Sequence, residues 1–365
     1  LAITVQSRDQ RHVEVRVADV ASGDTRPVWV DRDEQWVELV PGAGKLVAPD
    51  TVVTCADRDG ARRLVIGGDI VSPVDIQVRG IVQAGSDRVL VSGNPLDDPT
   101  VLHVYAWTSG GWAPITDGRG VHQAAVGTEA VVIRSATLDE PGAPWRLPSG
   151  HTLDRSGERP LVRPNVVLSA HTERLPTTAV LLPHDHDGSP LPVLLDPYGG
   201  PHAQRVLRSN HAFCASQWFA DQGFAVVIAD GRGTPGRGSR YERAVAGDLA
   251  GGVLDDQVAT LHAAAERHAE IDLGRVAIRG WSFGGYLAAL AVLRRPDVFH
   301  AAVAGAPVTE WRLYDTHYTE RYLGDPNERP EVYDASSLLP LAPALTRPLL
   351  LIHGLADDNV VAAHT

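Results

Sequence analysis

The chain has 365 residues, of which 44% are hydrophobic and 21% charged, and its formal net charge at pH 7 is −12. This length allows two domains with a sizeable core in each. The negative charge argues against nucleic acid or an anionic membrane surface as a partner. No apolar run approaches the roughly 18 residues that a membrane-spanning helix requires. Cys55 and Cys214 lie in compositionally different halves, so we expect no disulfide framework, which fits a cytoplasmic location.

The two ends of the sequence point to a longer polypeptide. The chain begins at Leu1 within a strand-like segment and contains no methionine. We therefore expect further sequence at both ends, and we infer nothing about a leader peptide.

Residues 1–160 have the pattern of an all-β domain. Residues 13–17 alternate valine with charged side chains, and residues 102–106 alternate in a similar way. Such two-residue periodicity is typical of half-buried antiparallel strands, and turn signals recur roughly every 8–12 residues. We expect residues 1–160 to form the last blades of a β-propeller-type domain, with room for about three four-stranded blades.

Residues 161–365 have a different pattern, in which strands alternate with helices. Short apolar runs, typical of strands buried on both faces of a parallel sheet, occupy residues 191–196, 224–229, 276–278, 301–304 and 348–352. Helical spacing is clearest from Leu254 to Ala265. We expect a doubly wound α/β domain with a mostly parallel sheet and with functional loops at the carboxyl ends of its strands.

The most informative segment is Gly280-Trp281-Ser282-Phe283-Gly284-Gly285-Tyr286. It lies between a strand-like run and a helix-forming run, which predicts the nucleophile elbow of an α/β hydrolase. Glycine is needed two residues before and after the serine, because side chains there would collide with the strand or the helix start. The elbow exposes the Ser282 hydroxyl. It also brings the backbone N–H of Phe283 to a helix N-terminus, where an oxyanion can be stabilised.

A second candidate element is the loop Asp196-Pro197-Tyr198-Gly199-Gly200-Pro201, which follows the first strand of the α/β region. In serine hydrolases an early loop of this kind supplies the second oxyanion donor. The hydroxyl of Tyr198 could donate a hydrogen bond to the oxyanion. Without the elbow, a simple Gly-Pro turn would explain the same residues.

The acid and the base of a triad are less well defined. Asp357 and Asp358 follow the last strand, and either could orient an imidazole. The spacing does not choose between them. His364 lies only seven residues after Asp357, which is too short for another strand and a return to the site. We interpret His364 as an exposed or helical residue and expect the catalytic histidine beyond Thr365.

Two other motifs suggest ligands but have simpler explanations. Residues 231–236 match the Gly-x-Gly-x-x-Gly dinucleotide pattern, but no apolar helix start follows them and no acidic residue ends a strand about 20 positions later. Residues 184–187 read His-Asp-His-Asp, which could bind a metal, yet these side chains crowd a single turn. We expect a solvated hairpin loop there, with no metal and no cofactor.

Several of these segments together resemble the prolyl oligopeptidase family of serine peptidases. The residues that carry the resemblance are Tyr198-Gly199-Gly200-Pro201, Asp230-Gly231-Arg232-Gly233, the elbow and Ala356-Asp357-Asp358-Asn359-Val360. The segment from Trp311 to Tyr322 resembles the dipeptidyl peptidase IV branch in particular. These matches follow one another from residue 196 to residue 360. The first half is similar to the propeller of that branch only in kind.

The resemblance implies a role for each matched residue. Ser282 would be the nucleophile and Asp357 the triad acid, with the Tyr198 hydroxyl and the Phe283 N–H as the oxyanion hole. Asn359 would hold the carbonyl of the residue before the scissile bond. A small apolar pocket would receive proline, because a flat ring packs well against aromatic faces. Its walls would be Val308, Trp311, Tyr314, Tyr318 and Val360.

The activity that the resemblance implies is hydrolysis of short peptides after proline or alanine, through an acyl-enzyme and with release of N-terminal dipeptides. The partner would be such a peptide, with neither nucleic acid nor membrane involved, and a homodimer is compatible with it. The family's paired-glutamate segment, which grips the free amino terminus, is missing from the sequence, as is the catalytic histidine. An acylaminoacyl peptidase or esterase on the same fold therefore remains an alternative, as does an inactive peptidase-like binding protein.

Overall fold

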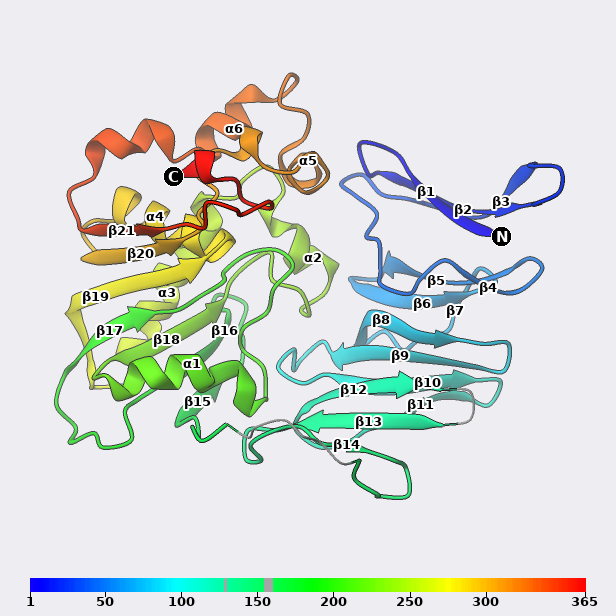
Figure 1. Ribbon diagram of the computed structural model, residues 1–365, viewed down its shortest axis with the longest axis horizontal. Coiled ribbons are helices and arrows are strands. Elements are labelled where there is room, and N and C mark those ends of the chain that lie inside the picture. The colour runs from blue at the N-terminus through cyan, green and yellow to red at the C-terminus, as the bar shows by residue number, and fades with distance from the viewer. Residues whose placement is uncertain (128–129, 154–159) are drawn as a thin grey trace. The chain divides into compact units, whose positions relative to one another are not determined.

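The computed structural model describes residues 1–127, 130–153 and 160–365 (Figure 1). The chain divides into two compact units. The first comprises residues 1–159 with the short segments 207–211 and 236–240, and the second comprises residues 160–206, 212–235 and 241–365. Every residue assigned a role by the resemblance therefore lies in the second unit.

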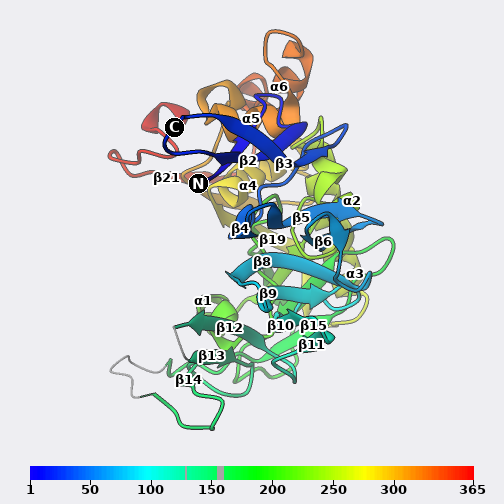
Figure 2. The same ribbon diagram turned by 90° about the vertical axis from the view of Figure 1, so that its right-hand side faces the viewer.

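The first unit is built of short antiparallel sheets. In its described residues four sheets follow one another in chain order, ordered β1-β2-β3, β4-β5-β6-β7, β11-β10-β9-β8 and β12-β13-β14 (Figures 1 and 2). Where about three four-stranded blades were expected, the described residues form two four-stranded and two three-stranded sheets. The strands are β1 (Ala2–Gln6), β2 (His12–Ala18), β3 (Thr25–Arg32), β4 (Lys45–Ala48), β5 (Thr51–Arg58), β6 (Ala61–Ile66), β7 (Asp69–Ile70), β8 (Ile76–Ala84), β9 (Arg88–Pro95), β10 (His103–Thr108), β11 (Gly111–Pro114), β12 (Val121–Val126), β13 (Val131–Ala136) and β14 (Trp145–Arg146).

The core of this unit lies between neighbouring sheets. Val13 and Val15 are buried, as the alternation in β2 predicts. The alternation expected in β10 fails, because Val104, Tyr105 and Ala106 are all buried in succession. Tyr105 stacks on Trp112 with ring centroids 5.2 Å apart and joins the apolar cluster of β5, β6, β8 and β9. A strand packed on both faces has no solvent side on which to place alternate residues.

A mixed sheet forms the centre of the second unit. In the described residues its strand order is β15-β16-β18-β17-β19-β20-β21. The strands β17, β18, β19, β20 and β21 run parallel to one another, whereas β16 pairs antiparallel with both β15 and β18. The strands are β15 (Val166–Ser169), β16 (Thr177–Leu181), β17 (Leu191–Leu195), β18 (Ala225–Asp230), β19 (Ile271–Trp281), β20 (Ala301–Gly305) and β21 (Leu349–Ile352).

Helices cover this sheet and connect its strands. In Figure 1, α1 lies in front of the strands and α3 behind them. The helix α4 packs against β19 and β20, and it is buried along most of its length. The longer helices are α1 (Asn210–Asp221), α3 (Gly251–Ala265), α4 (Phe283–Arg294), α5 (Thr316–Leu323) and α6 (Pro330–Ser336), and the short ones are α2 (Ser239–Glu242), η1 (Arg243–Val245), η2 (Trp311–Leu313), η3 (Leu339–Ala344) and η4 (Ala362–His364).

Burial in the sheet falls from its middle to one edge. All six residues of β18 are buried, as expected for a strand between two neighbours and two helical layers. The same expectation is wrong for β21, where Leu350 is 57% exposed and Ile352 44% exposed. In the described chain β21 is an edge strand with a single neighbour, β20, so its side chains lack a covering layer.

Two expectations about composition can be compared with this architecture. Cys55 is buried and Cys214 half-buried, and neither forms a disulfide in the part of the chain that the structure describes. No helix among residues 1–127, 130–153 and 160–365 is both long and apolar enough to cross a bilayer.

Candidate active site

The candidate residues gather at one edge of the sheet of the second unit. Tyr198 follows β17, Ser282 follows β19, and Asp357 follows β21. The segment with Val308 and the aromatic residues follows β20. Because β17, β19, β20 and β21 are parallel neighbours, their carboxyl ends meet at the same edge of the sheet, where ligands bind in open α/β folds.

Ser282 occupies a strained turn between β19 and α4. Its φ is 57° and its ψ is −119°, a combination that residues other than glycine rarely adopt. Two backbone bonds fix the turn, from the Ser282 N–H to the Gly305 carbonyl and from the Tyr286 N–H to the Ser282 carbonyl, both at 2.9 Å. The serine is only partly exposed, whereas the preceding Trp281 is 56% exposed. This is the geometry expected of a nucleophile elbow.

Close backbone approaches explain the glycines on either side of this turn. A Cβ at Gly280 would overlap the carbonyl group of Gly284. A Cβ at Gly284 would lie 2.7 Å from the carbonyl oxygen of Pro197, on the loop that carries Tyr198. The glycines therefore allow the strand, the helix start and this neighbouring loop to pack against one another.

The Tyr198 phenol lies beside the serine and stays protonated at neutral pH. Burial and the nearby phenol of Tyr314 raise the pKa of Tyr198, and the hydrogen bond with the side chain of Ser282 acts in the opposite direction. A protonated phenol can donate to an oxyanion, whereas a phenolate cannot. The Tyr198 ring also packs on Phe283, with centroids 5.9 Å apart.

A second donor is available at the start of α4. Phe283 is the first residue of this helix, and the first N–H groups of a helix have no acceptor within it. The positive end of the helix dipole adds to their attraction for negative charge. The Phe283 N–H and the Tyr198 hydroxyl are therefore two hydrogen-bond donors close to Ser282.

Aromatic side chains cluster next to the elbow. Trp311 and Tyr318 stack at 6.0 Å with an interplanar angle of 8°, and Tyr314 meets both rings edge-on. Phe283 joins the cluster to the elbow, because its ring centroid is 5.9 Å from that of Trp311. Trp311 lies on η2, Tyr318 on α5 and Tyr314 in the turn between them.

The remaining pocket candidates come from the loops after β20 and β21. Val308 and Val360 are buried, with 2% and 1% of their surfaces exposed. Asn359 is exposed, and its Oδ1 accepts a hydrogen bond of 3.2 Å from the Tyr314 hydroxyl. The structure thus links Asn359 directly to the aromatic cluster, while the two valines supply apolar surface.

Asp357 and Asp358 differ in their surroundings. The Oδ1 of Asp357 accepts hydrogen bonds from the N–H groups of Asn359, at 3.1 Å, and of Val360, at 2.9 Å. These bonds fix the carboxylate within the loop. Asp358 is exposed, and no bond of its side chain is recorded among the described residues. The geometry therefore favours Asp357 as an orienting acid.

Two histidines lie close to this loop in sequence. The ring of His353 contacts the Val360 carbonyl at 2.6 Å and the Thr365 hydroxyl at 2.5 Å, and its Nε2 is 3.9 Å from Asp357. His364, expected to be exposed or helical, is in η4 but only 3% exposed. Burial lowers its pKa. The backbone of His364 is held at both ends: its N–H donates to the Val361 carbonyl at 3.0 Å, and its carbonyl accepts from the Thr309 hydroxyl at 2.7 Å.

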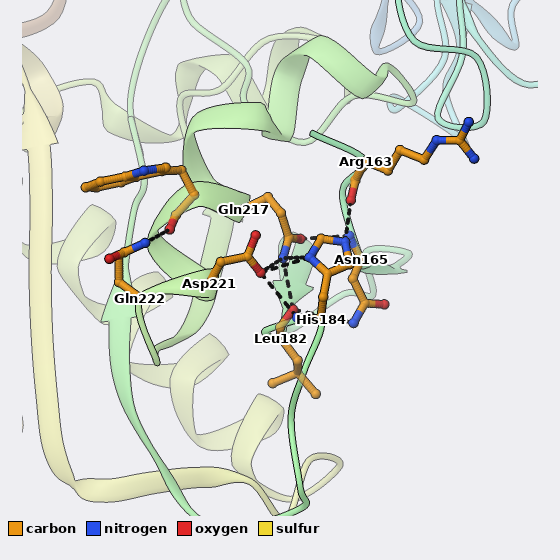
Figure 3. Close-up of polar contacts among 8 residues, drawn as sticks. Arg163, Asn165, Leu182, His184, Gln217, Asp221 and Gln222 are labelled. Carbon is orange, nitrogen blue, oxygen red and sulfur yellow. Dashed lines mark hydrogen bonds and ion pairs between the residues drawn. The ribbon is translucent and has the colours of Figure 1, made fainter. Parts of the chain in front are cut away.

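The first residue of the His-Asp-His-Asp segment, His184, contacts helix α1. The two ring nitrogens of His184 contact the Asp221 carboxylate at 2.9 Å and the Arg163 carbonyl at 2.8 Å (Figure 3). Gln217 donates to the same Asp221 oxygen at 2.8 Å. In the described residues no group of three or more histidine, cysteine, aspartate or glutamate side chains could hold a metal ion.

The glycine-rich segment 231–236 also has a structural role. Asp256 of α3 accepts from the Arg232 backbone N–H at 2.7 Å and from its guanidinium at 2.7 and 3.1 Å. This contact fixes the turn after β18. The residues that follow, 236–240, group with the first unit and include the start of the four-residue helix α2, which is too short to serve as a phosphate-binding helix.

One group near the site had no recognisable sequence signal. The buried carboxylate of Asp196 contacts the side chains of Arg205 and Arg279. Asp196 is simply the residue after a buried strand, and its two partners are 9 and 83 positions away. In the sequence, Asp196 stands out only as the first residue of the Tyr198 loop.

The comparison that decides the family comes from the carboxyl-terminal part of the chain. Residues 210–365 match the model of the prolyl oligopeptidase family. The chain carries a prolyl oligopeptidase family domain. The fold agrees with this, since a crystal structure of Porphyromonas gingivalis dipeptidyl peptidase 4 matches 100% of this chain and 55% of its own, with a TM-score of 0.86 at 23% identity. The fold is thus an α/β hydrolase domain preceded by a β-propeller-type domain.

Relatives of this family domain are dipeptidyl peptidases by name. Human dipeptidyl peptidase 8 is 40% identical over 224 residues, which cover 58% of this chain and 25% of that protein. Caenorhabditis elegans dipeptidyl peptidase family member 2 is 37% identical over 176 residues, which cover 48% and 21% respectively. The chain thus spans about a quarter or less of the length of these curated relatives.

Proposed function

We propose that this chain supplies the nucleophile, the oxyanion donors and the proline pocket of a serine peptidase that releases N-terminal dipeptides. The observation that carries the proposal is the pairing of Ser282 with Tyr198. A serine held at positive φ on a nucleophile elbow shares a hydrogen bond with a phenol whose pKa is raised. That combination serves a reaction in which negative charge develops on an oxygen beside the serine.

The chemistry proceeds in two steps through an acyl-enzyme. The Ser282 hydroxyl attacks the peptide carbonyl carbon while its proton passes to an imidazole, and the Tyr198 hydroxyl and Phe283 N–H stabilise the resulting oxyanion. The imidazolium then protonates the leaving amine, and water hydrolyses the ester by the reverse sequence. Asp357 orients the imidazole, which we assign to a histidine beyond Thr365.

The aromatic cluster suits a small cyclic side chain. Trp311, Tyr314 and Tyr318 offer flat apolar faces, and the buried Val308 and Val360 add aliphatic surface. Proline fits such a pocket because its ring is compact and uncharged, and alanine fits with less contact. Asn359 is positioned beside Tyr314, where its amide can hold the carbonyl of the residue before the scissile bond.

Dipeptide release, and the choice of a peptide as partner, follow the names of the relatives. Both relatives quoted above are called dipeptidyl peptidases. We extend that activity to the polypeptide that contains this chain, with a cytoplasmic location, a possible homodimer and no cofactor as parts of the same proposal.

The test uses the full-length polypeptide that contains these residues, assayed on a chromogenic alanyl-proline substrate with a free amino terminus. Wild type should turn this substrate over, and Ser282→Ala should lose at least about 10³-fold in kcat with an unchanged unfolding temperature. The N-acetylated substrate should be cleaved poorly. Retained turnover in Ser282→Ala would refute the nucleophile assignment. Preference for the acetylated substrate would indicate an acylaminoacyl peptidase, and binding without turnover would indicate an inactive scaffold.

A further inference from the structure

We propose that Asp196 is a positioning residue that fixes the Tyr198 phenol relative to Ser282, with Arg205 and Arg279 as its two anchors. This inference rests on the proposed peptidase function, in which the phenol stabilises the oxyanion. It assigns a role to three charged residues that are not part of the proposed triad, oxyanion hole or pocket.

The carboxylate of Asp196 is almost completely enclosed. Its side chain is 2% exposed, yet the strand before it and the proline after it offer no compensating charge. Oδ2 accepts from Arg205 Nη2 at 2.9 Å and from the Ser216 hydroxyl of α1 at 2.7 Å. A buried carboxylate is costly unless it is paired and hydrogen-bonded. Asp196 therefore has one favourable position, set by these partners.

The first anchor connects Asp196 to the strand of the nucleophile. Arg279 of β19 places its Nε 3.5 Å from Asp196 Oδ1. The sheet brings the two side chains together. Leu195 of β17 is in register with Ile278 of β19, and Asp196 and Arg279 are the residues that follow them. The Arg279 guanidinium also lies over the ring of Phe219, with its central carbon 4.2 Å from the ring centroid. Tyr198 lies two residues beyond Asp196, and Ser282 three residues beyond Arg279.

The second anchor closes the loop that carries the phenol. Arg205 lies seven residues after Tyr198, and its side chain returns to Asp196 at the start of the loop. The backbone at this end is also fixed. Asp230, the last residue of β18, accepts from the N–H groups of Arg205 at 2.9 Å and of Val206 at 2.8 Å. Both ends of the loop are therefore held by buried carboxylates at the edge of the sheet.

This arrangement controls the distance that matters for an oxyanion hole. The phenol must meet the oxyanion without reorganising during the reaction, and small misplacements of catalytic groups lower the rate by up to about 100-fold. The Asp196–Arg279 pair joins the end of β17 to β19, and the Asp196–Arg205 pair closes the loop that carries the phenol. Together they limit the motion of the phenol relative to the serine. Loss of Arg205 should loosen the phenol while leaving the elbow and the pocket unchanged.

The experiment compares Arg205→Gln, Arg205→Lys and the control Arg232→Gln in the full-length polypeptide. Arg232 makes a similarly exposed ion pair with Asp256 on the neighbouring loop, with 38% of its side chain exposed against 30% for Arg205. Arg205→Gln should lower kcat by about 10- to 100-fold with less than about a threefold change in KM. Arg205→Lys should recover part of the loss, and Arg232→Gln should have the wild-type kcat.

A double-mutant cycle separates positioning from general structural damage. In a Tyr198→Phe background, Arg205→Gln should lower kcat by less than about threefold, because the group it positions is already absent. Equal effects in both backgrounds would overturn the inference, as would an unchanged kcat in Arg205→Gln alone.

Hydrogen exchange supplies a readout that does not depend on activity. The amides of residues 198–204 should exchange faster in Arg205→Gln than in wild type and in Arg232→Gln. Unchanged exchange would overturn the inference even if the enzyme were active. An inactive wild type with faster loop exchange in Arg205→Gln would instead contradict the proposed function and leave the anchoring role supported.

Discussion

The phenol of Tyr314 donates a hydrogen bond of 3.2 Å to Oδ1 of Asn359 and so joins the loops after β20 and β21. The bond uses the amide oxygen of Asn359 and leaves its NH₂ group to donate elsewhere. In the proposed reaction that NH₂ group meets a substrate carbonyl. Tyr314 thereby sets the orientation of the amide as well as forming part of the pocket.

Tyr314→Phe removes this bond but keeps the ring. We expect kcat/KM for an alanyl-proline substrate to fall by about 5- to 20-fold, because a single hydrogen bond contributes roughly 1–2 kcal/mol. Steady-state kinetics on the full-length polypeptide measure this. Asn359→Ala should cost at least as much, and the two effects should not add. Additive losses would show that the two side chains act separately.

Tyr198→Phe tests the oxyanion donor. The phenol donates to the charge that develops in the transition state, so we expect kcat to fall by about 10²- to 10³-fold with little change in KM. The unfolding temperature should change little, since the ring remains packed on Phe283. A variant that loses affinity but keeps kcat would contradict this role. Pre-steady-state acylation rates provide the most direct measurement.

Gly284→Ala tests the packing of the elbow against the Tyr198 loop. The added Cβ would lie 2.7 Å from the Pro197 carbonyl oxygen, and such overpacking typically destabilises a protein by about 1–3 kcal/mol. We expect a lower free energy of unfolding in urea and a loss of activity. Gly110→Ala is the matched control, because the nearest atom to its added Cβ is a side-chain oxygen 3.5 Å away. Equal stabilities for the two variants would contradict the close approach.

The contact between His184 and Asp221 predicts a pH dependence of stability. The hydrogen bond to Asp221 raises the pKa of His184 above 6.5. For Asp221, burial favours a higher value, but hydrogen bonds from Gln217 and His184 outweigh it and lower the pKa below 3.8. The contribution of His184 is complete below pH 6.5 and is lost as the pH rises through its raised pKa. That of Asp221 is complete above pH 3.8 and is lost at lower pH.

His184→Gln measures this contribution. The difference in unfolding free energy between wild type and variant should be largest between about pH 4 and 6.5 and should shrink by pH 9. We expect at most about 1 kcal/mol, because the His184 side chain is 47% exposed and solvent screens the pair. Urea unfolding at several pH values gives the comparison. A difference that grows above pH 7 would have the wrong sign for an imidazolium bound to Asp221.

The sequence predicted the parts of the fold that depend on local patterns. Apolar runs located β17, β18 and β20, and the apolar spacing from Leu254 to Ala265 located α3. The elbow was predictable because a strand-like run, a glycine-flanked serine and a helix-forming run follow one another directly in the sequence. The segments after β17, β20 and β21 could be placed together because parallel strands end at one edge of a sheet.

Features that depend on tertiary contacts were not predictable. The antiparallel strands β15 and β16 are short, and they follow residues 141–164, a segment with five prolines in which no apolar periodicity develops. No helix was predicted between Trp311 and Tyr322, yet α5 forms there and Asp315 caps it by accepting from the His317 N–H at 2.8 Å. The partners of Asp196 meet it only because β17 and β19 are adjacent and in register. The separations of Arg205 and Arg279 from Asp196 in the sequence do not predict these contacts.

The backbone of Ser282 has a consequence for how this protein can evolve. A residue with a Cβ is held there at φ 57° and ψ −119°, and such conformations cost about 1–3 kcal/mol each. Glycine at 282 would relieve that cost but would remove the hydroxyl. Selection for stability alone would favour glycine at position 282. A serine at this position therefore indicates selection for its hydroxyl at the expense of the free energy of unfolding.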